Sequence, residues 1–232
     1  NKVNLGVGVY FDDNGKLPLL ECVQKAEAAL MAKPTARGYL PIDGIVAYDN
    51  AVKALVFGEG SEPVTSGRVA TVQAIGGTGG LKIGADFLKK ISPDAKVLIS
   101  DPSWENHRAL FTNAGFVVDT YAYYDAEKRG VNFDGMLASL NAAAPGTIIV
   151  LHACCHNPTG YDITPAQWDQ VVEVVKAKGL TAFLDMAYQG FGHGIAEDGA
   201  VIQKFVAAGL SFFVSTSFSK SFSLYGERVG AL

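Results

Sequence analysis

The sequence contains few cysteines and no long apolar run. Its three cysteines are Cys22 and the adjacent pair Cys154 and Cys155. They provide no disulfide framework, which indicates a reducing compartment such as the cytoplasm. The longest stretch without a charged residue, 135–161, is interrupted by polar side chains and does not predict a membrane-spanning helix.

Clusters of basic residues are also absent. The chain has 19 Lys and Arg against 23 Asp and Glu, a net charge of -4, and its basic residues are scattered. This distribution argues against a nucleic-acid partner. Because 49% of the residues are apolar, the chain can bury the core of one large domain. It begins with Asn1 rather than methionine and stops in an apolar run, so we expect it to be part of a longer protein.

From residue 68 onward, short apolar segments alternate with segments whose apolar residues recur at helical spacing. This alternation is typical of an α/β fold with a mostly parallel sheet and helices on both faces. The expected strands are 68–73, 96–100, 116–121, 147–152, 181–185 and 211–216. The expected helices are 18–33, 46–57, 78–90, 106–114, 133–143, 165–178 and 200–208.

Ligands in such folds bind beyond the carboxyl ends of the strands. The glycine-rich run 76–80 could hold a phosphate on backbone N–H groups, although a glycine-rich turn alone is more often structural. Trp104 could stack on a flat ring or be an ordinary half-buried tryptophan. Asp185 closes a buried strand and needs a partner, which is a protonated ring nitrogen, a helix N-terminus or a basic side chain.

The run that follows residue 152 also raises the possibility of a metal site. Cys154, Cys155 and His156 are potential zinc ligands, but their spacing matches no zinc-binding pattern. We therefore expect no metal in this chain.

Lys220 lies among hydroxyl and aromatic residues in segment 215–228, directly after an apolar segment that predicts a buried strand. A partly desolvated lysine at a strand end is shifted toward its neutral, nucleophilic form, as Schiff-base chemistry requires. The alternative is a solvated lysine in a polar loop. Taken with the candidates above and the hydrogen-bonding residues Asn157 and Tyr188, this lysine completes the set of groups needed to hold pyridoxal phosphate.

Five longer motifs support this interpretation and run in order along essentially the whole chain. They are Asn4-Leu-Gly-Val-Gly-Val-Tyr, Asp101-Pro-Ser-Trp-Glu-Asn-His, Cys155-His-Asn-Pro-Thr-Gly, Asp185-Met-Ala-Tyr-Gln-Gly-Phe and Ser217-Phe-Ser-Lys-Ser-Phe-Ser-Leu-Tyr-Gly-Glu-Arg-Val-Gly. The chain thereby resembles the class I aminotransferases of the aspartate and aromatic-amino-acid subfamily, which are fold-type I pyridoxal-phosphate enzymes. The second and last motifs look closer to the aromatic-amino-acid (tyrosine) aminotransferases.

The resemblance implies catalytic roles for Lys220, Asp185 and Tyr188. Lys220 would form the internal aldimine with the cofactor and later move the proton from the substrate's α-carbon. Asp185 would pair with the ring nitrogen, and His107 and His152 would support this acid from behind. Asn157 and Tyr188 would hydrogen-bond the phenolic oxygen of the ring. The residues implied to contact the rest of the cofactor are Trp104 on the ring and Gly77, Thr78, Ser217, Ser219 and Arg228 on the phosphate.

The resemblance also implies substrate contacts and a partner subunit. Gly6, Trp104 and Asn157 would contact the substrate, whereas Tyr39 would reach the phosphate of the neighbouring subunit in a homodimer. Residues 1–17 would associate with the small domain, and residues 18–232 would form a pyridoxal-phosphate-binding large domain, incomplete at its C-terminus, with the rest of the small domain absent. The family's substrate-carboxylate arginines match no position here, so a chain that ends at Leu232 is expected to be inactive alone.

The implied reaction transfers an amino group between an aromatic or acidic L-amino acid, such as tyrosine, phenylalanine or aspartate, and 2-oxoglutarate. One alternative is a pyridoxal-phosphate lyase or decarboxylase of the same fold. A second is a catalytically silent binding fragment. A nicotinamide dehydrogenase is disfavoured because the dinucleotide fingerprint is missing.

Overall fold

A seven-stranded sheet forms the centre of the structure, which is a computed structural model describing residues 6–232. Its strand order is β1-β9-β8-β7-β6-β2-β3. Strands β8, β7, β6, β2 and β3 are mutually parallel, whereas β9 pairs antiparallel with β8 and β1. The bounds are β1 Gln73–Ile75, β2 Lys96–Asp101, β3 Val117–Ala122, β6 Ile148–His152, β7 Thr181–Met186, β8 Phe213–Ser217 and β9 Val229–Ala231; β4 Tyr124–Asp125 and β5 Gly130–Val131 form a separate hairpin. The predicted mostly parallel sheet is confirmed.

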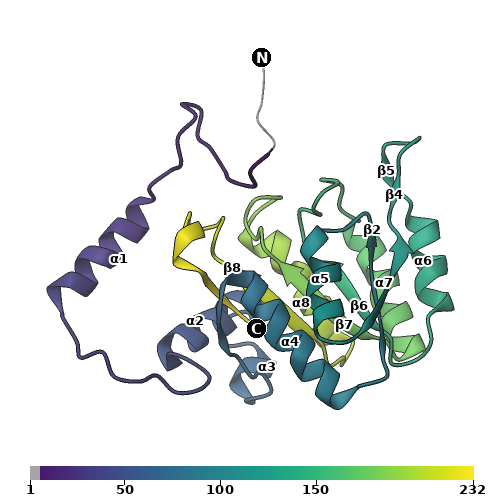
Figure 1. The fold of residues 1–232 in the computed structure, drawn as a ribbon, viewed down its shortest axis with the longest axis horizontal. Coiled ribbons are helices and arrows are strands. Elements are labelled where there is room, and N and C mark those ends of the chain that lie inside the picture. The colour runs from purple at the N-terminus through teal and green to yellow at the C-terminus, as the bar shows by residue number, and fades with distance from the viewer. Residues whose placement is uncertain (1–5) are drawn as a thin grey trace.

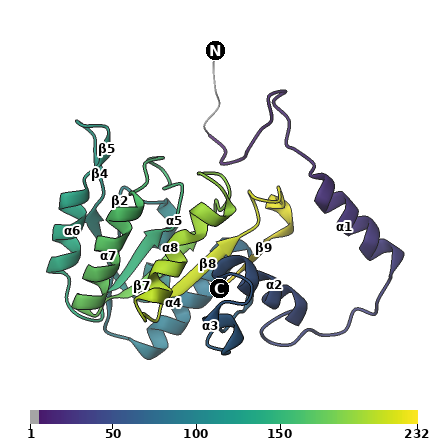
Figure 2. The ribbon, with the colours of Figure 1, turned by 180° about the vertical axis from the view of Figure 1, so that it is seen from behind.

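Helices cover both faces of this sheet (Figures 1 and 2). Their bounds are α1 Glu21–Ala32, α2 Val46–Phe57, α3 Glu62–Thr65, α4 Gly76–Ile91, α5 Glu105–Asn113, α6 Phe133–Ala142, α7 Pro165–Lys178 and α8 Ile195–Ala207. Alternate residues of β6 point to opposite faces: Ile148 and Val150 pack in one core with α4 and α5, and Ile149 and Leu151 in the other with α2, α6, α7 and α8. Because both faces are buried, the central strands are apolar nearly throughout.

Helix α4 starts earlier than expected, at Gly76 rather than residue 78, so the glycine-rich run is its first turns and not a preceding loop. Glycine is needed there because the helix lies unusually close to the sheet. A Cβ at Gly80 would come within 2.7 Å of the Ala231 carbonyl oxygen, and one at Gly84 within 2.5 Å of the Phe183 ring. This close packing offsets the weak helix propensity of glycine.

The strand expected at 68–73 is wrong, because residues 68–72 belong to no strand and only Gln73–Ile75 do. Residues 68–72 instead line a cavity between α2 and β8, and the apolar side chains of Val69 and Val72 are part of that lining. Helix α8 begins at Ile195, five residues before the expected start at residue 200. Its first turn contains the buried Asp198, a residue type that the apolar pattern does not mark as helical.

Helix α1 stands apart from the rest of the structure and buries none of its side chains (Figure 1, purple). Leu30 and Met31 on this helix are 74% and 83% exposed. No helix within residues 6–232 has both the length and the apolar character needed to cross a membrane.

Candidate active site

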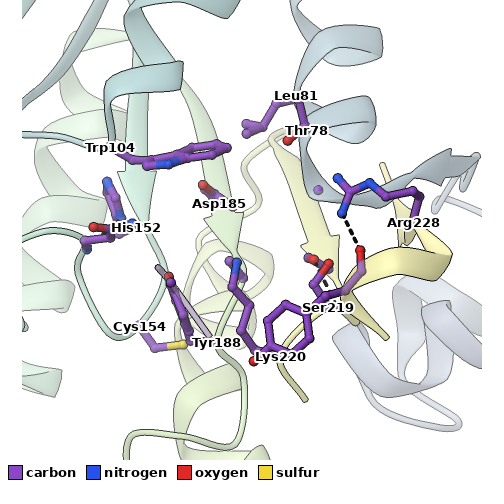
Figure 3. A pocket seen from close by; sticks show the side chains of 16 residues that line it. Thr78, Leu81, Trp104, His152, Cys154, Asp185, Tyr188, Ser219, Lys220 and Arg228 are labelled. Atoms are coloured by element: carbon purple, nitrogen blue, oxygen red, sulfur yellow. Dashed lines mark hydrogen bonds between the residues drawn. The ribbon is translucent and has the colours of Figure 1, made fainter. Parts of the chain in front are cut away.

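A cavity of about 280 Å³ opens at the carboxyl ends of β6, β7 and β8, beside the start of α4. Parallel strands bring their following residues to one edge of the sheet, which is where α/β folds bind ligands. The cavity, shown in Figure 3, is lined by Gly8, Gly77, Thr78, Leu81, Trp104, His152, Cys154, Asn157, Asp185, Ala187, Tyr188, Ser217, Ser219, Lys220, Tyr225 and Arg228.

Strand β7 delivers Asp185 to the centre of this cavity. Asp185 pairs in register with His152 of β6 and Ser215 of β8, so it lies between two other strand ends. It is 7% exposed, and its Oδ2 atom lies 2.8 Å from Nε2 of the fully buried His107 on α5. Among the described residues, no hydrogen bond reaches its other carboxylate oxygen, Oδ1. That oxygen is therefore free for a ligand with a proton to donate.

A hydrogen-bonded chain runs behind Asp185. The backbone N–H of Asn157 donates to Nδ1 of His152 over 3.3 Å, so this histidine has its proton on Nε2. From there the chain continues through Ser103 Oγ, 3.4 Å from His152 Nε2 and 2.9 Å from His107 Nδ1. Each group can then donate its proton toward Asp185. His152 Nε2–H donates to Ser103 Oγ, the Ser103 hydroxyl donates to His107 Nδ1, and His107 Nε2–H donates to Asp185 Oδ2. One oxygen of the Asp185 carboxylate is thereby held in place by a hydrogen bond.

Burial keeps His152 neutral, as the hydrogen-bonded chain requires. The pKa of His152 lies well below its usual value, chiefly because burial disfavours the charged ring, with further contributions from His107 and His156. The three imidazoles lie close together, with ring centres 4.9 Å apart for His107 and His152 and 4.2 Å for His152 and His156. Several positive charges in this cluster would repel one another.

Lys220 follows β8 and projects toward the cavity from below Asp185 (Figure 3). Its Nζ atom lies 4.8 Å from the ring centre of Tyr188. Burial lowers the pKa of this amine, the negative charge of Asp185 opposes that change, and Arg228 adds to it. Lys220 is the single lysine on the cavity lining within the described chain. A half-buried lysine with a lowered pKa has more of the neutral form that attacks a carbonyl carbon.

Tyr188 lies beside Lys220 and interacts with Asn157. Its pKa is raised, first by burial and then by the charge of Asp185, and a side-chain hydrogen bond from Asn157 lowers it in part. The phenol is therefore protonated at neutral pH and can donate a hydrogen bond into the cavity.

The start of α4 and the end of the 217–228 segment form a positively polarised corner. Gly76 and Gly77 bring the helix backbone against Arg228 and Ser217, since a Cβ on them would lie 2.6 Å from Arg228 Nη2 and 3.1 Å from Ser217 Cβ. Helix α4 has 16 residues and no acid in its first turn, so its N-terminus keeps its partial positive charge. Among residues 6–232, Arg228 has no ion-pair partner; its Nη1 donates to the Tyr225 carbonyl over 2.9 Å. Such a corner suits an anion like phosphate.

Trp104 closes the top of the cavity, with its ring lying across the space above Asp185 (Figure 3). It precedes the first turn of α5, and its ring meets that of His107 edge-on, with centres 5.4 Å apart. This edge contact leaves a ring face directed at the cavity.

Two of the predicted contact residues do not line this chain's cavity. Gly6 is not on the cavity lining; the chain bends at residues 6 and 7, and Gly8, two residues later, reaches the cavity. The substrate contact at Gly6 stays a prediction. Tyr39 is fully exposed and lies on the segment that connects α1 to α2, so it is not part of this chain's own cavity.

Other cavity residues were not predicted from the sequence. Tyr225 lines the cavity, and its hydroxyl accepts a hydrogen bond from the backbone N–H of Tyr10 over 2.9 Å. The ring of Tyr10 in turn meets that of Phe191 edge-on at 5.8 Å. These contacts join the N-terminal segment to two distant loops. The one sequence signal for Tyr225 was its position in the motif that contains Lys220.

Comparison with known proteins identifies the fold. The aspartate aminotransferase of Pseudomonas aeruginosa is 63% identical over 231 residues, which is 100% of this chain and 58% of that protein. The aromatic-amino-acid aminotransferase of Escherichia coli is 51% identical over 233 residues, 100% of this chain and 59% of that protein. The chain thus spans somewhat more than half the length of these relatives.

The solved structures agree. The aromatic-amino-acid aminotransferase from Burkholderia pseudomallei, covalently bound to pyridoxal phosphate, superposes with a TM-score of 0.97 at 66% identity, covering 99% of this chain and 58% of that one. The predicted fold-type I architecture and the predicted family are both confirmed. The family described as "Aminotransferase class I and II" matches residues 1–232, and the chain therefore belongs to that family.

Proposed function

We propose that the protein is a pyridoxal-phosphate-dependent transaminase that moves an amino group between an aromatic or acidic L-amino acid and 2-oxoglutarate. The observation that supports this most strongly is the meeting of three features in one cavity. They are the lysine amine of Lys220, the buried carboxylate of Asp185 and the anion-binding corner at Arg228. One ligand that satisfies all three has an aldehyde, a protonated ring nitrogen and a phosphate.

The residues present fit this cofactor. Asp185 Oδ1 would hold the ring nitrogen, and Trp104 would cover one face of the ring. The phosphate would lie on the N–H groups at Gly77 and Thr78, with the Ser217 and Ser219 hydroxyls and Arg228 around it. When bound, pyridoxal phosphate supplies an aldehyde that condenses with amines and a protonated ring that accepts an electron pair.

The surrounding residues divide the remaining tasks. Lys220 Nζ attaches the cofactor and moves the α-proton of the substrate, for which it needs its lowered pKa. The Tyr188 hydroxyl and the Asn157 amide donate hydrogen bonds to the phenolic oxygen. The chain through His107, Ser103 and His152 would hold the Asp185 carboxylate in place for the ring nitrogen.

The substrate class rests on the relatives rather than on the cavity. Their names include aspartate, tyrosine and aromatic-amino-acid aminotransferases. We propose that the protein accepts one or both classes of amino donor, as the sequence motifs indicated, and that it acts in the cytoplasm.

We also propose a homodimer with shared active sites. Helix α1 buries nothing in its own chain, and the segment after it exposes Tyr39 and Ile42 fully. A second copy that covers these residues would bring Tyr39 to the partner's phosphate corner.

The test is an amino-transfer assay. The whole protein, with any sequence that flanks residues 1–232, is purified, loaded with pyridoxal phosphate and given L-tyrosine, L-phenylalanine or L-aspartate with 2-oxoglutarate, and glutamate is measured. We expect glutamate formation with at least one donor, and none with Lys220→Ala, whereas Lys178→Ala on the outer helix α7 serves as the matched control. Release of CO₂ or ammonia without glutamate would contradict the proposal and favour a decarboxylase or lyase.

A further inference from the structure

Two adjacent thiols and a carboxylate meet beneath the active-site cavity. One ligand atom each from Cys154, Cys155 and Asp198 lies within 4.8 Å of the other two. Cys154 and Asp198 are buried, at 6% and 5% exposure, and Cys155 is half-buried. Asp198 comes from the first turn of α8, 43 residues after Cys155, so the spacing along the sequence gave no sign of this cluster.

Asp198 is held rigidly and still has an acceptor position to offer. Its Oδ2 accepts hydrogen bonds from the backbone N–H groups of Gly190 and Gly192, and its Oδ1 accepts one from His193. A carboxylate has about four lone-pair sites. The three N–H groups occupy three of them, which leaves one on Oδ1.

The charges around the thiols favour a cation. One carboxylate oxygen of Asp198 lies within 4.8 Å of both sulfur atoms. A second carboxylate, that of Asp162, is fixed by the backbone N–H groups of Cys155 and His156 at 2.7 and 2.8 Å. Negative charge on these two residues would attract a cation bound at the thiols.

We propose that Cys154, Cys155 and Asp198 form a binding site for a soft, thiophilic divalent cation of the Zn²⁺ or Cd²⁺ type. Two thiolates and a carboxylate supply three tetrahedral positions and leave the fourth for water. With metal–sulfur bonds of about 2.3 Å, tetrahedral geometry places the sulfurs about 3.8 Å apart, which is within the spread of this cluster. Two S–H bonds break, their protons pass to water, and two metal–sulfur bonds form.

The site touches the cavity but does not depend on the proposed reaction. Cys154 lines the cavity, and Cys155 is close enough to Tyr188 to affect its pKa. A bound cation would therefore change the electrostatic potential at the Tyr188 hydroxyl. This proposal departs from the expectation that the chain has no metal site, because the third ligand comes from a helix distant in sequence.

The test uses Cd²⁺ as the probe. The purified protein is incubated with CdCl₂ under reducing conditions and desalted, after which bound metal is measured by mass spectrometry and thiolate coordination by ultraviolet charge-transfer absorbance. We expect one Cd²⁺ per chain, proton release on binding, and an affinity that rises with pH. Because these readouts need no catalysis, their failure is distinguishable from failure of the transaminase proposal.

Cysteine variants locate the bound ion. Cys154→Ser and Cys155→Ser should each weaken Cd²⁺ binding at least tenfold, whereas Cys22→Ser, which removes an exposed thiol on α1, should leave it unchanged. The proposal is overturned if the unmodified protein retains no Cd²⁺, or if both variants retain it as well as the unmodified protein does. The result for the unmodified protein decides the matter even if a variant fails to fold.

Discussion

At the scale of single residues, Asp185 is the group on which the proposed cofactor site depends. It lies near the end of β7 with one oxygen held by His107, and it lines the cavity. A buried carboxylate needs hydrogen-bond partners. The chain of donors from Asn157 through His152 and Ser103 supplies one of them through His107.

Asp185→Asn should therefore lower transaminase activity while leaving the fold intact. Loss of one preorganised electrostatic contact at a reacting group typically lowers the rate by about 10² to 10³-fold, and we expect a loss of that order. The measurement is kcat/KM for glutamate formation, with circular dichroism to check folding. Asp94→Asn, an exposed aspartate outside the site, is the control. Activity within a few-fold of the unmodified protein would show that Asp185 has no such role.

Some cavity residues could be located from sequence because they lie at strand ends. Lys220 and Trp104 come shortly after β8 and β2, and Asp185 lies near the end of β7. The alternation of apolar segments was enough to bring them to one edge, where all three line the cavity; their roles there stay predictions. Ser103 and Asp198 could not be found in this way. Ser103 links His107 to His152, which lies 49 residues away, and Asp198 accepts hydrogen bonds from backbone N–H groups of a loop.

At the scale of elements, the connection from β6 to α7 holds the most unusual set of buried groups. His156 is 2% exposed, stacks on Tyr123 with ring centres 3.9 Å apart, and bonds Ser100 and Thr159 at 2.8 Å each. Burial, with a smaller contribution from His107, lowers its pKa to about 4. The connection ends at the capping box of Thr164 and Gln167, where both hydrogen bonds of the box are present.

This connection should make the protein lose stability in acid. Between pH 6.5 and about 4, His156 binds a proton in the unfolded chain but not in the folded one, so stability falls as the pH falls through this window. The shift corresponds to about 3 kcal/mol, and His152 adds a loss of the same sign.

Urea unfolding at pH 7 and pH 4.5 measures this loss. His156→Gln should reduce the difference between the two pH values, although it also lowers stability at pH 7 by removing two hydrogen bonds. His193→Gln, at an exposed position, should leave the difference unchanged. An unchanged difference in His156→Gln would remove this histidine from the explanation.

Strands buried on both faces and helices with clear periodicity were predicted best. β6 and β7 are long apolar runs, and α2 and α7 have clear periodicity, so their bounds agree closely with expectation. β1 and β9 have three residues each, too few for a period, and their antiparallel pairing joins segments more than 150 residues apart. Such a pairing is decided by the whole fold.

At the scale of the whole molecule, helix α1 lies apart from the sheet and its helices, and contacts within one chain do not explain its position. A helix of this length with no tertiary packing is marginally stable in water. Its exposed Leu30 and Met31, and the exposed Leu40 and Ile42 that follow, are apolar side chains that the proposed partner would cover.

Charges placed on this surface should disrupt the proposed homodimer. We expect the unmodified protein to sediment as a dimer at micromolar concentration, and Leu30→Glu with Met31→Glu to shift it toward monomer. Val117→Glu, on the exposed edge strand β3, controls for adding charge at an exposed apolar position. Sedimentation equilibrium gives the masses. A monomeric unmodified protein, or a double variant that stays fully dimeric, would contradict the expectation.

The central claim is that Lys220 bonds covalently to pyridoxal phosphate in this cavity. The most direct measurement is borohydride reduction of the cofactor-loaded protein, followed by proteolysis and peptide mass spectrometry. We predict a single reduced phosphopyridoxyl group on the peptide that contains Lys220, and its absence from Lys220→Ala. A group found on another lysine, or on none, would show that the cavity does not hold the cofactor as described.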